Sequence, residues 1–349
     1  MIQRMDEKPA YRWREPTWRQ AAESWIRQSA ARLGMEVTGP VEGVRFLPWS
    51  AVLRAPTPAG DLFFKACGPS QRHEPALAAF LATLHPEWVI PVLATDLQQG
   101  WLLMPDGGLT LTPFIRTPDD GPDHWRRILH GMGSLQRDLI PHVPHLLELG
   151  VPDRRLAELP PLLDSLLQRP ERLLAGEPGA LAWDDVRRLS RLRPRVAELC
   201  AELSDLGPPA CYVQDDFHED HIFPRQDQHG KWHYRVFDFG DACIAHPFFQ
   251  LVSQPRFFPN RYADVDHPFK ISLYEVYFDE WDTYASRPSL RRARRIAHAL
   301  GGIMRAMTWI NACGESTDEL LPDLRQYYKE GVSYWLGQVA IRTEELHGN

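Results

Sequence analysis

The segment between Asp215 and Asp241 constrains this sequence more than any other part. It contains four histidines and seven acidic residues, Asp215, Asp216, Glu219, Asp220, Asp227, Asp238 and Asp241. Apolar runs precede the acids at residues 211–213 and 236–237. A carboxylate at the end of a buried strand is costly unless it is paired or binds a metal, so such groups commonly perform chemistry. The segment therefore predicts a functional site, with ordinary caps and turn residues as the alternative explanation.

The first hundred residues alternate between helical and strand-like patterns. The first helix is expected to begin near Thr17, which can cap it, and to stop near Gly34. Beyond it we expect a helix at 74–84 and strands at 44–46, 51–54, 61–65, 89–93 and 101–104. These elements predict a β-rich N-terminal lobe over about residues 1–104.

The character of the sequence changes at residue 105, where a stretch rich in Pro, Gly, Thr and Asp begins. Helical patterns then dominate, at about 123–139, 153–168, 183–205, 268–285, 290–311 and 317–345. Only the acid-rich region interrupts them, with strand patterns at 211–214, 222–225 and 233–239. The pattern predicts a mainly helical lobe over about 105–349, and a ligand cleft between the two lobes.

Two stretches of the acid-rich segment resemble the catalytic core of the aminoglycoside phosphotransferase and choline kinase-like family, which is related to the protein kinases. Residues 214–221, QDDFHEDH, resemble the family's loop H-G/D-D-x-H-x-x-N, and residues 236–241, VFDFGD, resemble its metal-binding strand. Residues 245–251, AHPFFQL, resemble the opening of the helix that follows. The resemblance covers most of the chain and implies an α+β, bilobed protein-kinase-like fold.

The resemblance implies that ATP phosphorylates a hydroxyl of a small molecule, with Mg²⁺ as cofactor. Phosphoryl transfer needs a carboxylate that orients the attacking hydroxyl and cations that hold the phosphates. By position, Asp216 is the catalytic base, and Asp238 is a metal ligand whose hard oxygens suit Mg²⁺. His218 is expected to brace the loop by hydrogen bonding. Asp241 is either a carboxylate behind the metal site or a cap of the next turn.

The resemblance also implies a set of nucleotide-binding residues in the N-terminal lobe. Lys65 stands where the family's strand lysine holds the α- and β-phosphates, and Glu74 either pairs with it or is a first-turn acid of its helix. The hairpin at residues 43–53 has one glycine, so Ser50 is the candidate phosphate contact, unless this is an ordinary hairpin turn. Main-chain groups near Met104 are expected to bind adenine at the hinge between the lobes.

Two positions depart from the family pattern. Gln214 replaces the first histidine of the loop, and His221 replaces the metal-binding asparagine. An imidazole nitrogen suits Mn²⁺, Zn²⁺ or Co²⁺ better than Mg²⁺. We therefore expect either a metal site of Asp238 and His221 with a preference for Mn²⁺, or a single metal held through Asp238.

Two other functions remain as alternatives. One is a nucleotide-binding pseudokinase without turnover, since His221 occupies the asparagine position. The other is a metal-dependent hydrolase built on His218 and His221, although these histidines are three positions apart and HExxH zinc sites need four.

The composition narrows the partners and the location. The net charge of −7, from 39 basic and 46 acidic residues, argues against a nucleic-acid partner and mildly favours a cationic or metal-bound one. With the family resemblance, the acidic loop beside Asp216 suits an amine-bearing acceptor such as an aminoglycoside, choline or an amino sugar, and a neutral acceptor stays open. Five scattered cysteines without a CxxC pair fit a reducing cytoplasm. No signal peptide or membrane span is expected, because apolar runs are short. The sequence leaves the acceptor, the choice of ATP or GTP, and the oligomeric state open.

Overall fold

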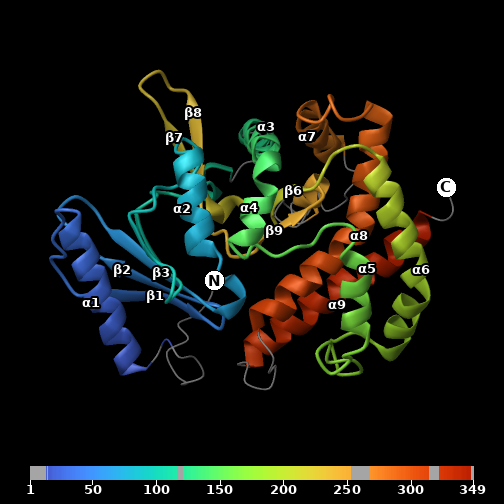
Figure 1. The fold of residues 1–349 in the computed structure, drawn as a ribbon, viewed down its shortest axis with the longest axis horizontal. Helices are drawn as coiled ribbons and strands as arrows, with labels where there is room; N and C mark the ends of the chain where they lie inside the picture. Colours follow the sequence, from blue (N-terminus) through green and yellow to red (C-terminus); the bar gives the residue numbers. More distant parts are fainter. Residues whose placement is uncertain (1–12, 14, 116–120, 253–267, 314–321, 347–349) are drawn as a thin grey trace.

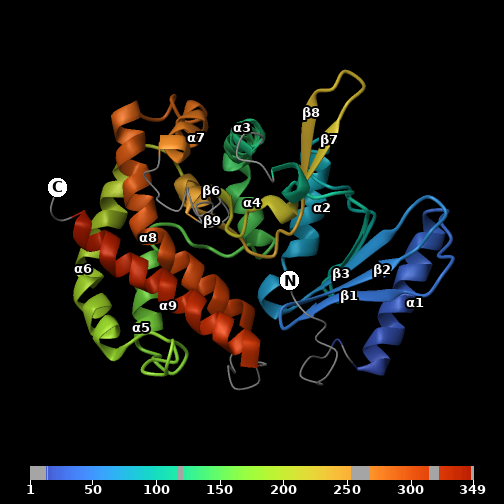
Figure 2. The same cartoon turned by 180° about the vertical axis from the view of Figure 1, so that it is seen from behind.

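The computed structural model describes residues 13, 15–115, 121–252, 268–313 and 322–346. A twisted antiparallel sheet with two helices forms one lobe, and a larger helical lobe lies beside it, as Figure 1 and the reverse view in Figure 2 show. This arrangement confirms the predicted α+β, bilobed fold. The division between residues 104 and 105 remains a prediction.

The N-terminal lobe is built on a five-stranded antiparallel sheet of order β1-β2-β3-β5-β4. Its strands are β1 (Glu42–Leu47), β2 (Ser50–Ala55), β3 (Leu62–Cys67), β4 (Ala94–Asp96) and β5 (Trp101–Pro105). Helix α1 (Pro16–Arg32) covers its outer face, and α2 (Glu74–Leu84) lies between the sheet and the helical lobe (Figure 1).

Side-chain alternation along the strands separates the two faces of this sheet. Leu53 and Phe64 are cross-strand partners that belong to the apolar core under α1, where Trp25 contacts the ring of Phe64 at 5.7 Å. Their neighbours Val52 and Lys65 are also partners, and they lie on the opposite face because successive side chains alternate. The strand pattern of the sequence therefore directs Lys65 toward the helical lobe.

Two local predictions in this lobe are wrong. Helix α1 begins at Pro16, with Glu15 before it, so Thr17 lies inside the first turn and is no cap. Proline is favoured at this position because the first turn leaves its N–H groups unbonded anyway. Residues 89–93 do not form a strand, since Val89 makes only an isolated bridge and β4 begins at Ala94. Pro91, which lacks an N–H, interrupts the run.

The helical lobe contains seven helices in its described part. They are α3 (Gly121–Leu139), α4 (Val143–Glu148), α5 (Leu159–Leu167), α6 (Trp183–Asp205), α7 (Pro268–Asp279), α8 (Arg287–Cys313) and α9 (Pro322–Glu345). The sequence patterns missed α4 and placed the start of α5 six residues too early, at 153. Positions 317–321 of the predicted last helix lie outside the described residues. Helices α8 and α9 pack against each other and form the wall that faces the N-terminal lobe (Figure 2).

The acid-rich segment forms two small antiparallel sheets. One pairs β6 (Cys211–Gln214) with β9 (Ala242–Ala245), and the other is the hairpin of β7 (Ile222–Gln226) and β8 (Trp232–Val236). Strand β9 was not predicted, and the strand expected at 233–239 ends at Val236, because Asp238 has a positive φ of 64° that breaks the extended chain.

All five cysteines are buried and free. Among the described helices, none is long and apolar enough to cross a membrane.

Candidate active site

A cavity of about 700 Å³ lies between the lobes. Its walls come from β1 to β3, the end of β5, the loops after β6 and β8, and helices α8 and α9. Five of the seven predicted site residues line it, namely Lys65, Met104, Asp216, His221 and Asp238. Glu74 and Ser50 do not line the cavity.

Lys65 joins the two lobes through a buried ion-pair chain. Its Nζ lies 2.7 Å from the Glu74 carboxylate and 2.8 Å from Oδ1 of Asp238, which is 173 residues away in sequence. Burial alone would lower the pKa of Lys65, but Asp238 and Glu74 outweigh it and hold the pKa above its ordinary value. The pKa of Asp238 is held well below its usual range by Lys65, against the effect of burial. Both groups are therefore ionised at neutral pH.

Glu74 supports this chain from behind. Its carboxylate also accepts hydrogen bonds from the backbone N–H of Phe239, at 3.1 Å, and from the Cys67 thiol, at 3.2 Å. The predicted pairing with Lys65 is therefore present in the structure, and α2 positions the lysine without entering the cavity.

Gln214 organises the backbone that carries Asp238. Its side-chain amide donates to the carbonyl oxygens of Phe237 and Asp238, each at 2.9 Å. Asp238 adopts the left-handed conformation that few residues other than glycine occupy, at a cost of about 1–3 kcal/mol, so the surrounding contacts must hold it there. The side-chain amide of Gln214 has two N–H donors, one for each of these carbonyl groups. This gives a physical reason for a glutamine at a position where the resembling family has a histidine.

Arg305 on α8 holds Asp216, and sequence reasoning missed it. Its guanidinium donates to Oδ1 of Asp216 at 2.9 Å and to the carbonyl oxygen of Asp215 at 2.8 Å. Burial would raise the pKa of Asp216, but Arg305, followed by His221 and His218, lowers it below the ordinary value. Asp216 is thus a fixed, ionised carboxylate in the cavity wall.

Asp215 anchors the same loop to the helical lobe. Its Oδ2 accepts from the Thr308 hydroxyl at 2.6 Å and lies 3.3 Å from Arg305 and 3.5 Å from Arg154. Arg154 also donates to Thr308 Oγ1 at 2.6 Å, so Asp215, Thr308 and Arg154 each contact the other two. Nothing in the local sequence marked Arg154 or Arg305 as partners of Asp215, because their meeting depends on how α8 and the α4–α5 connection pack.

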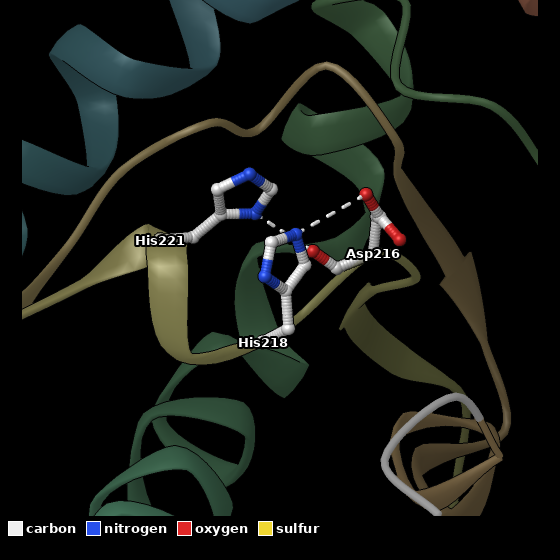
Figure 3. Close-up of side chains that lie close together, drawn as sticks. All are labelled: Asp216, His218 and His221. Carbon is white, nitrogen blue, oxygen red and sulfur yellow. Dashed lines mark hydrogen bonds and ion pairs between the residues drawn. The ribbon is translucent and has the colours of Figure 1, made fainter. Parts of the chain in front are cut away.

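The two histidines of the loop differ in which nitrogen is available. Figure 3 shows their rings facing each other beside Asp216, and the three residues offer ligand atoms within 4.8 Å of one another. His221 Nδ1 lies 2.9 Å from the carbonyl oxygen of Asp216. A carbonyl only accepts, so Nδ1 carries a proton, and in the neutral ring the lone pair is on Nε2. Nε2 lies 3.4 Å from Asp238 Oδ2, so these two atoms can share one ion.

His218 has the opposite tautomer. Its Nδ1 accepts from the backbone N–H of Asp220 at 3.3 Å, so Nε2 carries the proton and points toward Asp216 Oδ2, 3.7 Å away. Burial, followed by the charge of His221, lowers the pKa of His218 to about 4. His218 is therefore a neutral hydrogen-bonding group in this loop, and in this tautomer its Nε2 donates toward Asp216.

Asp241 and Ser50 complete the predicted set. Asp241 lines the cavity and accepts from the Gln71 amide at 3.0 Å, while burial and then the charges of Asp216 and Asp238 raise its pKa to about 7. Ser50 is the first residue of β2, paired with Leu47 and Cys67, and its hydroxyl is buried with no partner among the described residues. The structure therefore does not bring Ser50 to the cavity.

Comparison with protein-family models and with curated protein sequences finds no match. Solved structures do match over nearly the whole chain. An ethanolamine kinase of Plasmodium vivax matches with a TM-score of 0.58 at 11% identity, covering 94% of this chain and 89% of its own. A macrolide 2′-phosphotransferase of type I has a TM-score of 0.56 at 14% identity and covers 90% and 97%.

A third match is the GDP complex of an aminoglycoside 2′-phosphotransferase, with a TM-score of 0.56 at 12% identity, covering 93% and 99%. All three alignments include both lobes, because each spans at least nine-tenths of this chain. The chain therefore has the kinase-like fold of the aminoglycoside phosphotransferases and the choline and ethanolamine kinases.

Proposed function

We propose that this protein is a small-molecule kinase that transfers the γ-phosphoryl group of ATP to a hydroxyl. The observation that carries the proposal is that Asp216 and Asp238 line one cavity together with Lys65 from the opposite lobe. Positioning and electrostatic stabilisation are what phosphoryl transfer requires of a protein. The kinase-like fold supports the same conclusion.

The nucleotide is assigned to the side of the cavity formed by the sheet. Lys65 would contact the α- and β-phosphates, since it lies in the cavity wall and two neighbouring carboxylates keep its ammonium group protonated. Main-chain groups around Met104, at the end of β5, would bind the adenine ring where the lobes join.

A divalent cation fits between Asp238 Oδ2 and His221 Nε2. Their separation of 3.4 Å suits two adjacent ligands of one ion, and the carbonyl oxygen of Asp216 fixes the tautomer that leaves Nε2 free. One oxygen and one nitrogen donor favour Mn²⁺ over Mg²⁺ relative to an all-oxygen site. When bound, the ion supplies positive charge to the phosphate oxygens.

Asp216 is assigned to the acceptor hydroxyl. Arg305 engages Oδ1, so Oδ2 remains to accept the proton of the substrate. As the acceptor oxygen bonds to the γ-phosphorus and the bond to the ADP oxygen breaks, the hydroxyl proton passes to Asp216. The low pKa of this carboxylate suits orientation of the hydroxyl and late proton transfer.

The acceptor would occupy the side of the cavity formed by the helical lobe. Trp309 of α8 and Tyr327 of α9 line it, with ring centroids 5.2 Å apart, and Trp49 of the β1–β2 turn approaches Trp309 from the other lobe, with ring centroids 6.3 Å apart. Aromatic faces and nearby carboxylates attract organic cations. An amine-bearing acceptor in the aminoglycoside, choline or amino-sugar class fits these walls, and the cytoplasm remains the proposed location.

An ATP-consumption panel across hydroxyl-bearing amines, with Mg²⁺ and Mn²⁺, tests the proposal. GTP is included because one of the similar solved structures is a GDP complex. We expect acceptor-dependent consumption that falls at least 10²-fold in Asp216→Asn. Asp227→Asn is the matched control, since Asp227 lies in the β7–β8 turn and does not line the cavity. Equal activity of Asp216→Asn and wild type would overturn the assignment.

The pseudokinase alternative rests on His221 and gives a different outcome of the same panel. It predicts that ATP raises the melting temperature while no acceptor is phosphorylated with either metal. Retention of stoichiometric zinc together with indifference to ATP would point instead to a hydrolase.

A further inference from the structure

The hairpin that faces the proposed phosphate site offers few backbone donors. β1 and β2 are joined by a two-residue turn, Pro48 and Trp49, and Leu47 already pairs with Ser50. Proline has no N–H, and the strand amides on either side belong to the ladder. A glycine-rich turn that wraps phosphates with its amides is therefore absent from this hairpin, so a side chain is the group that the hairpin can offer to a phosphate.

Arg45 is the charged residue that this hairpin contributes to the cavity wall. The lining residues from β1, the turn and β2 are Val44, Arg45, Leu47, Trp49 and Val52. The pairing register shifts between Gly43 and Arg45, which marks a bulge. A bulge redirects the side chains beside it, and bulges are common next to active sites. The hairpin thus directs one guanidinium into the space above Asp238.

The contact that Arg45 makes there is loose. Its Nη2 lies 3.9 Å from Asp238 Oδ2, at the limit of an ion pair, and its side chain is 44% exposed. Among the described residues, the other permanent cations that line the cavity are each held by two carboxylates: Lys65 by Glu74 and Asp238, and Arg305 by Asp215 and Asp216. Of the permanent cations that line the described part of the cavity, Arg45 is therefore the one held most weakly by its carboxylate.

The charge balance of the cavity gives that exchange a reason. Its lining contains the cations Arg45, Lys65 and Arg305 and the carboxylates Asp106, Asp216, Asp220, Asp238 and Asp241. A triphosphate adds further negative charge to this space. A divalent cation on Asp238 would at the same time take the carboxylate oxygen that Arg45 now faces, because Oδ2 is also the atom nearest His221.

We propose that Arg45 is a phosphate-binding residue that leaves Asp238 when the divalent cation arrives and binds the β- and γ-phosphate oxygens of the nucleotide. The proposal rests on the proposed function. A guanidinium can make two parallel hydrogen bonds to a phosphate, so one side chain replaces several loop amides. Arg45 would also close the N-terminal lobe over the triphosphate.

Calorimetric binding of adenosine, ADP and a non-hydrolysable ATP analogue with Mn²⁺ tests this role without turnover. The variants are Arg45→Met and Arg45→Lys, and the control is Arg54→Met on β2. Arg54 pairs with Glu42 and Asp61, has a similar exposure of 43%, and does not line the cavity. We expect Arg45→Met to weaken the ATP analogue about 10–100-fold, the range of a hydrogen bond to a charged group.

The pattern across ligands separates binding from a structural effect. Adenosine affinity should change less than about twofold, ADP should be weakened less than the ATP analogue, and Arg45→Lys should restore part of the loss. Equal losses for adenosine and the ATP analogue would overturn the proposal, and so would unchanged affinity for the analogue in Arg45→Met. A wild-type protein that binds no nucleotide would instead overturn the proposed function, and Arg45 with it.

Discussion

Asp215→Asn tests whether the buried network beneath the loop that carries Asp216 stabilises the helical lobe. The substitution keeps the shape of the side chain but removes its charge. Arg154 would then lie buried without a carboxylate partner and Arg305 would keep only Asp216, while the side chains of Asp215, Arg154 and Arg305 are at most 6% exposed. Breaking a buried pair on one side costs about 3–5 kcal/mol, because the remaining charge stays desolvated.

The magnitude follows from the size of the chain. At about 2.1 cal/mol/K per residue, the unfolding entropy is about 0.7 kcal/mol/K for 349 residues. A loss of 3–5 kcal/mol therefore lowers the melting temperature by about 4–7 °C. Differential scanning calorimetry measures this shift, and Asp227→Asn, which is close in sequence but partly exposed, should move the melting temperature by less than about 2 °C.

A double variant separates charge pairing from general disruption. Arg154→Met combined with Asp215→Asn removes one of the stranded cations, so the double variant should lose less stability than the two single variants added together. If Asp215→Asn melts within 2 °C of the wild type, or if the two losses simply add, the buried network is not the source of stability that the contacts indicate.

Three further predictions concern the cavity. His221→Asn should lower the ratio of the Mn²⁺ rate to the Mg²⁺ rate, because a nitrogen ligand is replaced by an oxygen; an unchanged ratio removes His221 from the metal site. Gln214→Ala should weaken Mn²⁺ binding about tenfold, because the carbonyl groups of Phe237 and Asp238 lose their hydrogen-bond donor. Gln214→His should retain more Mn²⁺ affinity than Gln214→Ala. Equal Mn²⁺ affinities of wild type and both variants would contradict this role of Gln214. The pKa of Asp241 is raised to about 7 in the folded protein. Between about pH 4 and 7 the folded state therefore binds more protons than the unfolded state. The stability that this group contributes falls as the pH rises through that window. Asp241→Asn should accordingly gain stability relative to wild type from pH 4.5 to pH 8 in urea denaturation, and a constant difference would show that Asp241 titrates normally.

The linear spacing of the acid-rich segment was enough to predict the central residues of the site. Asp216 and Asp238 follow β6 and β8 after short apolar runs, and local periodicity determines where such strands end. The alternation of residues 61–65 likewise directs Lys65 away from the α1 face, which follows from strand geometry alone. These features depend on neighbours within a few residues, so a single sequence contains them.

Other features depended on packing between distant segments. Arg305 and Arg154 meet Asp215 only because α8 and the α4–α5 connection converge on the loop, and each looked like an ordinary helix or turn arginine in sequence. Arg45 and Ser50 lie in the same hairpin, but a bulge directs the former into the cavity and the ladder buries the latter.

The sequence by itself was enough to single out Asp216, Asp238 and Lys65, because the motifs that carry the family resemblance are local and short-range pattern decides strand ends and strand faces. Only the tertiary structure decided which cations neutralise the two carboxylates, which nitrogen of His221 faces a carbonyl, and which hairpin residue lines the cavity. Those choices depend on distances of a few ångströms between groups that are tens to hundreds of residues apart, and electrostatic energies change steeply over such distances.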